Sequence, residues 1–254
     1  MSSWSSHPSE IILGNFRLGW IDPLTRIFST LAVLSLLLLG ANFVIGLSIG
    51  DFNQVAKDYS SAYREFTSSQ TNPDLSNEQK VEIQRRLDAA KEKIPAPRQK
   101  MTIHFFLGVA SSLMAVLVNS ITVTYFIGTS RWCREVVETY ALPPELSQQS
   151  ATLKRRTFPY ALMGMLTVLG IVTLGALSDP SVPWNKDRSY LYVTPHYLAA
   201  MAGTAFLAFL FWIQASRMAD NYAVIQEIMR LVDLARGRGG EFELPPSTSQ
   251  KESL

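Results

Sequence analysis

Four long apolar runs, separated by polar segments, dominate the pattern of hydrophobic and polar positions along this chain. The runs cover residues 27–49, 103–127, 158–177 and 194–213. Each is long enough for a helix that crosses a bilayer, which takes about 20 residues at about 1.5 Å per residue. No Asp, Glu, Lys or Arg lies inside these runs. The pattern predicts an all-α, polytopic membrane protein built as a four-transmembrane-helix bundle.

The second and fourth apolar runs continue as amphipathic sequence instead of ending at the membrane surface. Beyond residue 128 the second run carries Arg131 and Arg134 on one side and aromatic side chains such as Tyr140 on another. The fourth run continues with an apolar stripe that includes Met218, as far as the glycines from Gly237 onward. We therefore expect both helices to extend into water and to pack together there.

Residues 51–100 have a different composition, with nine Lys/Arg and eight Asp/Glu side chains. Asn72-Pro73-Asp74 is a turn signal, and Ser76-Asn77-Glu78-Gln79 is a capping box at the start of a helix. Pro95 and Pro97 are expected to stop that helix. This segment predicts a helical extramembrane hairpin that packs on itself or on a partner. A solvated connector is the alternative interpretation, because balanced charge is usual on exposed helices.

The predicted organisation has nine segments in chain order. They are a polar N-terminal segment (1–26), transmembrane helix 1 (27–49), the extramembrane hairpin (50–100), transmembrane helix 2 with a cytosolic extension (101–141), a basic connector (142–157), transmembrane helix 3 (158–178), a short outer loop (179–193), transmembrane helix 4 with a cytosolic extension (194–236) and a disordered tail (237–254).

Four spans place both termini on one side of the membrane. Lys and Arg near the helix ends are slightly more numerous on that side, which favours cytoplasmic termini. The expected location is a bacterial inner membrane. Lys154-Arg155-Arg156 directly precedes the third span. We interpret this triplet as a topology anchor, with contact to anionic lipid as the second interpretation.

Composition narrows the function classes. The chain is 47% hydrophobic and only 17% charged, and its net charge of +2 gives no support for nucleic-acid binding. Membrane lipids are expected partners, together with proteins of a membrane complex or further copies of the chain. The single cysteine, Cys133, excludes an internal disulfide and is expected to be a buried thiol. No motif of a hydrolase or transferase is present, so the sequence argues against such an enzyme.

Polar side chains inside the spans are few. Asn119 in the second span and Asn42 in the first are each expected to form an interhelical hydrogen bond, with the other as a candidate partner. The absence of central charges argues against a proton pump or an ion-coupled transporter.

Two of the three histidines occupy matching positions in the sequence. His104 lies a few residues into the second span and His196 a few residues into the fourth, and both spans enter the membrane from the same side. The two imidazoles are therefore expected at similar depth. Small residues follow each histidine on its own helix face, at the fourth and seventh positions: Gly108 and Ser111 after His104, and Ala200 and Gly203 after His196.

Small residues beside paired histidines leave room for a flat macrocycle between two helices. One interpretation is a haem b site in which His104 and His196 are the axial ligands of the iron and the four small residues form the slot. In general architecture this resembles membrane-anchor cytochrome b subunits, which is an analogy without a shared motif. Structural histidines that only form hydrogen bonds are a second interpretation, and a metal or quinone-type pocket is a third.

The sequence leaves two function classes open. The leading prediction is a multi-pass membrane subunit that acts as a scaffold or interaction component of a membrane complex. The alternative is a cytochrome b-like electron-transfer subunit with one bis-histidine haem near the outer membrane face.

Overall fold

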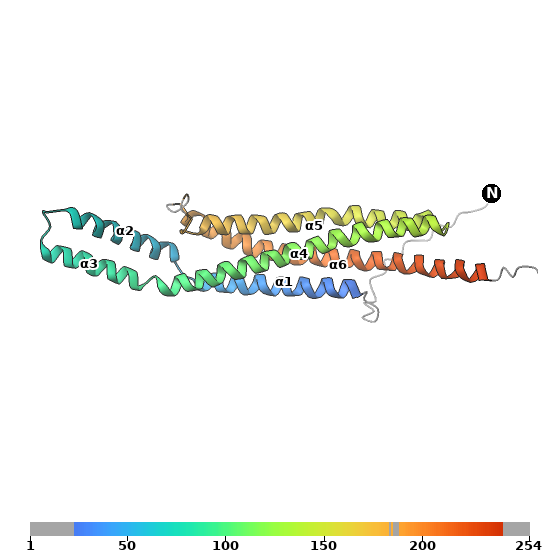
Figure 1. Ribbon diagram of the computed structural model, residues 1–254, viewed down its shortest axis with the longest axis horizontal. Coiled ribbons are helices and arrows are strands. Elements are labelled where there is room, and N and C mark those ends of the chain that lie inside the picture. The colour runs from blue at the N-terminus through green and yellow to red at the C-terminus, as the bar shows by residue number, and fades with distance from the viewer. Residues whose placement is uncertain (1–22, 183, 185–187, 241–254) are drawn as a thin grey trace, which may run out of the picture.

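In the computed structural model, which describes residues 23–182, 184 and 188–240, every regular element is an α-helix (Figure 1). The helices in chain order are α1 (Pro23–Ser48), α2 (Phe52–Thr71), α3 (Asn77–Glu92), α4 (Pro95–Thr139), α5 (Pro144–Ser178) and α6 (Tyr190–Gly240).

Helices α1, α4, α5 and α6 are long and apolar enough to cross a membrane. Large apolar side chains on all four point away from the bundle: Leu37, Leu113, Leu169 and Trp212 are each at least 60% exposed. In water each would forgo about 1.5–3 kcal/mol of burial free energy, whereas lipid tails cover them at no such cost. The prediction of an all-α, four-span membrane bundle is confirmed, and the chain is an integral, multi-pass membrane protein in contact with lipid.

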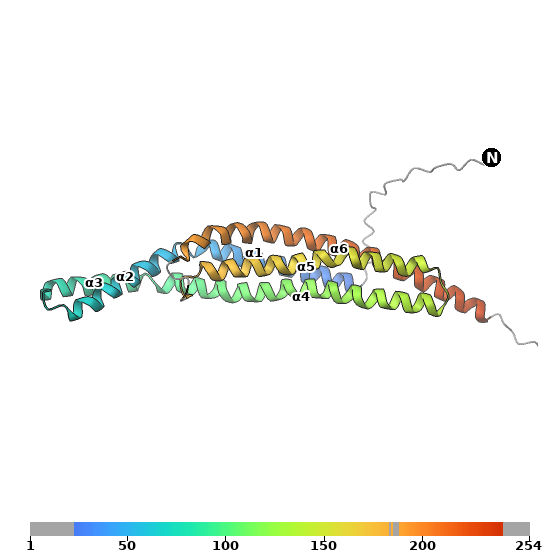
Figure 2. The ribbon, with the colours of Figure 1, turned by 90° about the horizontal axis from the view of Figure 1, so that it is seen from above.

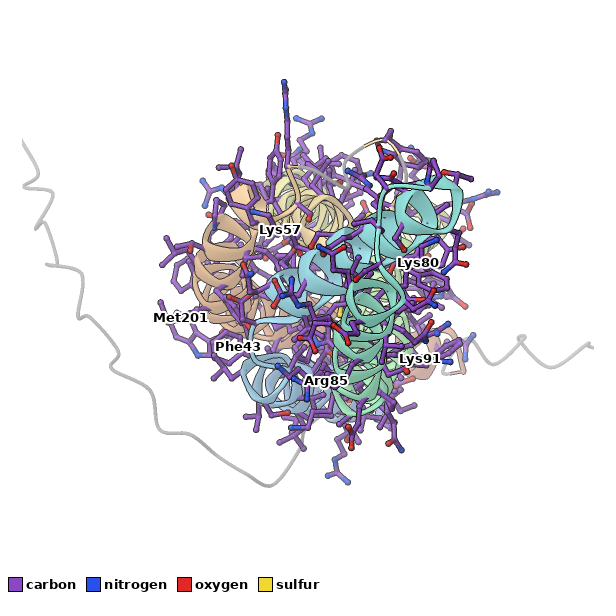
Figure 3. The ribbon with its side chains drawn as sticks, turned by 90° about the vertical axis from the view of Figure 1, so that its left-hand side faces the viewer. Phe43, Lys57, Lys80, Arg85, Lys91 and Met201 are labelled. Atoms are coloured by element: carbon purple, nitrogen blue, oxygen red, sulfur yellow. The ribbon has the colours of Figure 1, made fainter. Side chains whose placement is uncertain are left out.

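The four spans form a ring in the order α1, α4, α5, α6. Figure 3, viewed along the bundle, shows α1 and α5 on opposite sides, each lying between α4 and α6. Helices α4 and α6 therefore face each other diagonally, and they still touch across the centre. Several buried polar side chains lie along this diagonal seam.

Helices α2 and α3 form the predicted hairpin, which projects beyond one end of the bundle (Figures 1 and 2). We call this the hairpin end and the opposite end the terminus end. Ser76 and Gln79 form the expected capping box at the start of α3, with the Gln79 N–H donating to the Ser76 hydroxyl at 3.2 Å and the Ser76 N–H to the Gln79 side chain at 2.9 Å. Charged side chains such as Lys80, Arg85 and Lys91 extend outward around the hairpin (Figure 3).

Polar side chains tie the hairpin end together where the spans stop. The Lys100 ammonium donates to the Ser48 carbonyl at 2.7 Å, which caps the end of α1. The Asn53 amide donates to the Ser178 carbonyl at 3.4 Å and accepts from the Ser189 hydroxyl, which links α2 to α5 and α6. These contacts satisfy carbonyls that a helix end leaves without an intrahelical donor.

Several predicted boundaries differ from the structure because prolines begin helices here. Helix α4 starts at Pro95, six residues before the expected span at 101–141, and α5 starts at Pro144, inside the expected connector at 142–157. Proline fits the first turn of a helix, where its missing N–H has no intrahelical partner in any case. Residues 144–157 are thus helical, and three helices rather than two extend beyond the membrane at the terminus end.

At the other boundaries, α1 begins at Pro23 rather than at 27, and α6 runs from Tyr190 to Gly240, beyond both limits of the expected 194–236. The predicted N-terminal segment lies outside the described residues up to position 22, as do positions 241–254 of the predicted tail.

The extensions of α4 and α6 pack together at the terminus end, as predicted. Cys133 and Val137 of α4 are buried against Ile228 and Val232 of α6, and Leu146 of α5 packs on the same cluster. The Arg236 guanidinium donates to the Tyr140 hydroxyl at 2.7 Å at the edge of this cluster. Burial raises the pKa of the Cys133 thiol above its ordinary value, so the structural role predicted for this cysteine agrees with its surroundings.

A row of buried polar side chains, the polar column, runs along the diagonal seam. In the membrane part, the Gln214 amide donates to Asn119 Oδ1 at 3.0 Å and accepts from the Thr122 hydroxyl at 2.6 Å. Nearer the terminus end, the Asn221 amide donates to the Tyr125 hydroxyl at 3.3 Å and accepts from the Ser150 hydroxyl of α5 at 2.8 Å. The column consists of Asn119, Thr122, Tyr125, Gln214 and Asn221.

The partner expected for Asn119 is corrected by this arrangement. Asn42 lies near the hairpin end beside Gly108, while Asn119 bonds to Gln214 and to the Ala115 carbonyl. Antiparallel packing of α1 on α4 sets this register, which the sequence of either helix does not reveal. Gln214, placed just outside the expected fourth span, is fully buried and completes the column.

Gly164 provides a test of the packing between α5 and the polar column. A methyl group at Gly164 would overlap the Asn119 amide, whereas one at Gly170 of the same helix would meet no atom within 4 Å. We expect Gly164→Ala to lower the free energy of unfolding by about 1–3 kcal/mol, the usual cost of overpacking, and Gly170→Ala to leave it unchanged. Equilibrium unfolding in mixed micelles measures both, and equal effects would contradict the described approach of α5.

The Asn119–Gln214 hydrogen bond can be measured by a double-mutant cycle with Asn119→Leu and Gln214→Leu. Interhelical hydrogen bonds in membranes contribute about 0.6 kcal/mol on average and up to about 2 kcal/mol. We expect a favourable coupling energy in this range from the same unfolding assay. Ser120→Ala is the control, because within the described ranges the Ser120 hydroxyl bonds to its own helix alone, at the Val116 carbonyl. A coupling energy of zero would rule out the direct contact.

Candidate functional site

His104 and His196 meet at the centre of the bundle near its hairpin end. Their ring centroids lie 6.2 Å apart and their planes cross at 77°. The two residues come from the diagonal helices α4 and α6, and no bulky side chain separates the rings. The sequence predicted equal depth for the histidines, and the structure adds that they face each other.

The ring of His104 is held by two features of α1. Its Nδ1 lies 3.1 Å from the Asn42 carbonyl oxygen. Because a carbonyl only accepts, Nδ1 carries the proton and donates, which leaves Nε2 as an unprotonated nitrogen. Gly46, one turn further along α1, allows the ring to approach: a Cβ there would lie 3.0 Å from Cε1 of the imidazole.

His196 repeats this arrangement on α5. A Cβ at Gly175 would lie 3.0 Å from Cε1 of His196, and the backbone of Ile171, four residues earlier, lies beside the ring. Nδ1 of His196 is buried and has no hydrogen-bond partner within the described part of the chain. A buried polar atom without a partner is costly, particularly in a membrane, so this nitrogen calls for a ligand, a water or a small ring rotation.

The two histidines thus pack on their neighbouring helices in the same way. Each ring lies on a glycine that is four residues after a backbone group beside the ring, Asn42 before Gly46 and Ile171 before Gly175. Without a side chain at the glycine, the imidazole reaches the backbone one turn below. Helix α1 therefore positions the His104 ring and helix α5 positions the His196 ring. The two rings converge on the centre of the bundle from opposite sides.

A cavity of about 390 Å³ adjoins the two rings. All four spans contribute to its largely apolar wall, including Leu39 of α1, Ser112 of α4, Ile171 of α5 and Tyr197 of α6. The Tyr197 hydroxyl donates to the Gly46 carbonyl at 2.8 Å, which fastens α6 to α1 beside the cavity. The size is within the range of about 300–1,000 Å³ that is usual for small-molecule and cofactor sites.

Only half of the predicted slot lines this cavity. Gly108 and Ser111 of α4 do, but Ala200 and Gly203 are not among its lining residues. Gly203 instead lets α5 approach α6, since a Cβ there would meet the side chains of Ile171 and Thr167. The glycines that admit the histidines are Gly46 and Gly175, which sequence reasoning missed because they lie on the other two spans. The sequence offers no specific signal for these two glycines, because each one acts through a histidine on another helix.

The residues of the site limit which metals it can hold. Among the described residues, no group of three or more His, Cys, Asp or Glu side chains is placed to bind a metal ion. Zinc sites usually take three or four protein ligands. The histidine pair therefore supplies two ligands, and a metal held here takes its remaining ligands from a cofactor, a bound small molecule or water.

No protein-family model, curated protein or solved structure matches this chain.

Proposed function

We propose that the bundle binds one haem b near its hairpin end, with His104 and His196 as axial ligands, and that the protein is an electron-transfer subunit of a membrane. The observation that carries this proposal is the convergence of the two imidazoles, 6.2 Å apart, from diagonal helices. The same proposal places both termini in the cytoplasm of a bacterium and the haem near the outer face of its inner membrane.

The ring separation is compatible with one metal ion between the imidazoles. A metal–imidazole bond is about 2 Å long, and the bonded nitrogen lies about 1 Å from the ring centre, so two imidazoles on opposite sides of one metal have centroids about 6 Å apart. The crossing angle of 77° is no obstacle, because each ring can rotate about its own bond to the metal.

The surroundings of His104 also favour ligation by Nε2. Metal-bound histidines usually donate their second N–H to a carboxylate or a backbone carbonyl, which orients the ring and raises its basicity. The bond from Nδ1 to the Asn42 carbonyl meets this requirement. The Ile171 backbone of α5 lies beside the ring of His196 and would accept the same kind of bond, since Nδ1 of His196 has no partner of good geometry among the described residues.

A porphyrin would supply the remaining ligands of the iron from its four nitrogens, so the two histidines are the only ligands that the described residues need to provide. Haem in such a site carries single electrons, with a potential set by its axial ligands and by burial. The chain itself would supply the two imidazoles, the apolar wall and exclusion of water. Arg98 lines a neighbouring groove that shares Met101 and Phe105 with the histidine cavity, and it is a candidate to pair with an acidic edge of the cofactor.

Haem binding is tested by reduced-minus-oxidised spectra of the protein purified in mild detergent from haem-replete cells. We expect a b-type spectrum that is lost in His104→Ala and in His196→Ala. His7→Ala removes the remaining histidine of the chain and is expected to leave the spectrum unchanged. A colourless wild-type protein that stays colourless after reconstitution with haem would overturn the proposal.

Two glycine pairs test the geometry without touching a ligand. Gly46→Ala and Gly175→Ala each push a histidine ring, whereas Gly40→Ala and Gly170→Ala on the same helices add a methyl group in open space. Changes in groups that orient metal ligands commonly lower affinity by about 10- to 100-fold. We expect weaker haem retention of this order in the first two variants only.

A membrane scaffold is the second candidate function, and one observation favours it. The hairpin carries a tyrosine pair, Tyr59 and Tyr63, with ring centroids 6.2 Å apart beside a groove of about 510 Å³ outside the bundle. Tyr63 is 53% exposed. Exposed tyrosines are enriched at protein contacts, where they bury a large area with little loss of entropy. The partner would be another protein of a membrane complex or a second copy of the chain.

Native electrophoresis of mildly solubilised membranes tests the scaffold function. We expect the chain to migrate in an assembly that Tyr59→Ser with Tyr63→Ser disrupts, because the contact loses both rings. Lys80→Ser with Lys91→Ser is the matched control on the same hairpin, and it should leave the assembly intact. A chain that migrates as a monomer in every variant would contradict the scaffold function and would not affect the haem proposal.

A further inference from the structure

A second hollow lies on the lipid-facing surface between α4 and α5, at the terminus end of the membrane. Its volume is about 420 Å³. Phe126, which is 2% exposed, forms part of its floor, and Ile127 and Phe158 flank it with more than half of their surface exposed. We call this hollow the α4–α5 groove. Its walls are almost entirely apolar, and it is distinct from the cavity at the histidines.

Two cations of the basic triplet border this apolar groove. Lys154 and Arg155 line it, whereas Arg156, the third member, does not. Neither Lys154 nor Arg155 forms an ion pair with an Asp or Glu side chain of the described residues. Lys and Arg close to a membrane surface attract anionic lipid with about 1 kcal/mol each. Positive charge therefore stands at the rim of a hollow that suits a hydrocarbon chain.

Proline adds a hydrogen-bond acceptor to the same place. Pro159 lies inside α5 and has no N–H, so the Arg155 carbonyl lacks its usual helical donor. Both residues line the groove. A carbonyl at the membrane surface that lacks its i+4 helical donor is a suitable acceptor for a hydroxyl group of a lipid headgroup.

We infer that the α4–α5 groove binds an anionic phospholipid, with an acyl chain along Phe126 and Phe158 and the phosphate between Lys154 and Arg155. The charge at the rim, the apolar walls and the position at the end of two spans all fit this occupant. A peptide fits less well, since its backbone polar groups would find few partners along walls of this kind. The triplet is then a binding site in addition to a topology anchor.

Native mass spectrometry of the full-length protein, released from detergent with added lipid, tests this inference. The probes are phosphatidylglycerol and phosphatidylcholine with identical acyl chains, in equal parts. We expect one phosphatidylglycerol to be retained preferentially. Loss of one cation should weaken its retention about fivefold, so we expect this change in Lys154→Gln and in Arg155→Gln.

Arg156→Gln is the matched control, because it removes the same charge from the same membrane edge without altering the groove. Equal weakening in all three variants would indicate diffuse attraction to the surface and overturn the site, as would equal retention of both lipids by the wild type. Val123→Trp fills the groove and keeps every charge, so it should also abolish the preference for phosphatidylglycerol. If the preference survives in this variant, the acyl chain does not bind in the groove and the inference is wrong. Soluble glycerol 3-phosphate should not compete, and displacement by it would indicate a site for a free phosphate group instead of a lipid.

Discussion

The diagonal contact between α4 and α6 has to form without the hydrophobic force that brings helices together in water. Lipid tails are as apolar as leucine, so association depends on close packing and on hydrogen bonds between helices. The polar column supplies the hydrogen bonds, above all between Asn119, Thr122 and Gln214. Gly164 of α5 leaves room for the Asn119 amide, so that α5 packs closely beside this column. The hydrogen bonds of the column join the two diagonal helices directly across the bundle.

The position of the histidines follows from the same seam. At the terminus end the seam is closed by the column and by the cluster around Cys133 and Ile228. At the hairpin end it opens into the cavity, where His104 and His196 replace the amides and hydroxyls. Helices α1 and α5 position the rings through Gly46 and Gly175. The bundle is therefore closely packed at the terminus end and hollow where the two imidazoles converge.

The residues at which helices begin are the feature of the fold that the sequence predicts least well. Helix α3 ends at Glu92, before Pro95 and Pro97, as expected, but a new helix, α4, begins at Pro95 itself. Helix α5 begins in the same way at Pro144, inside the expected connector. Proline excludes itself from a helix interior but suits the first turn, so the same residue marks an end or a beginning. Whether a proline marks an end or a beginning depends on the residues that follow it. Residues 142–157 have the composition of a connector, yet Leu146 and Ser150 among them pack against α4 and α6.

The sequence by itself determined the number of spans, the hairpin and the equal depth of the histidines. Each of these follows from local properties, namely the length of apolar runs, a capping box and distance from a helix start. Tertiary structure alone decided the helix order, the facing of the rings and the roles of Gly46, Gly175 and Gln214. The reason is physical: glycines and amides act through side chains on other helices, and the register between two apolar helices is set by how their surfaces pack.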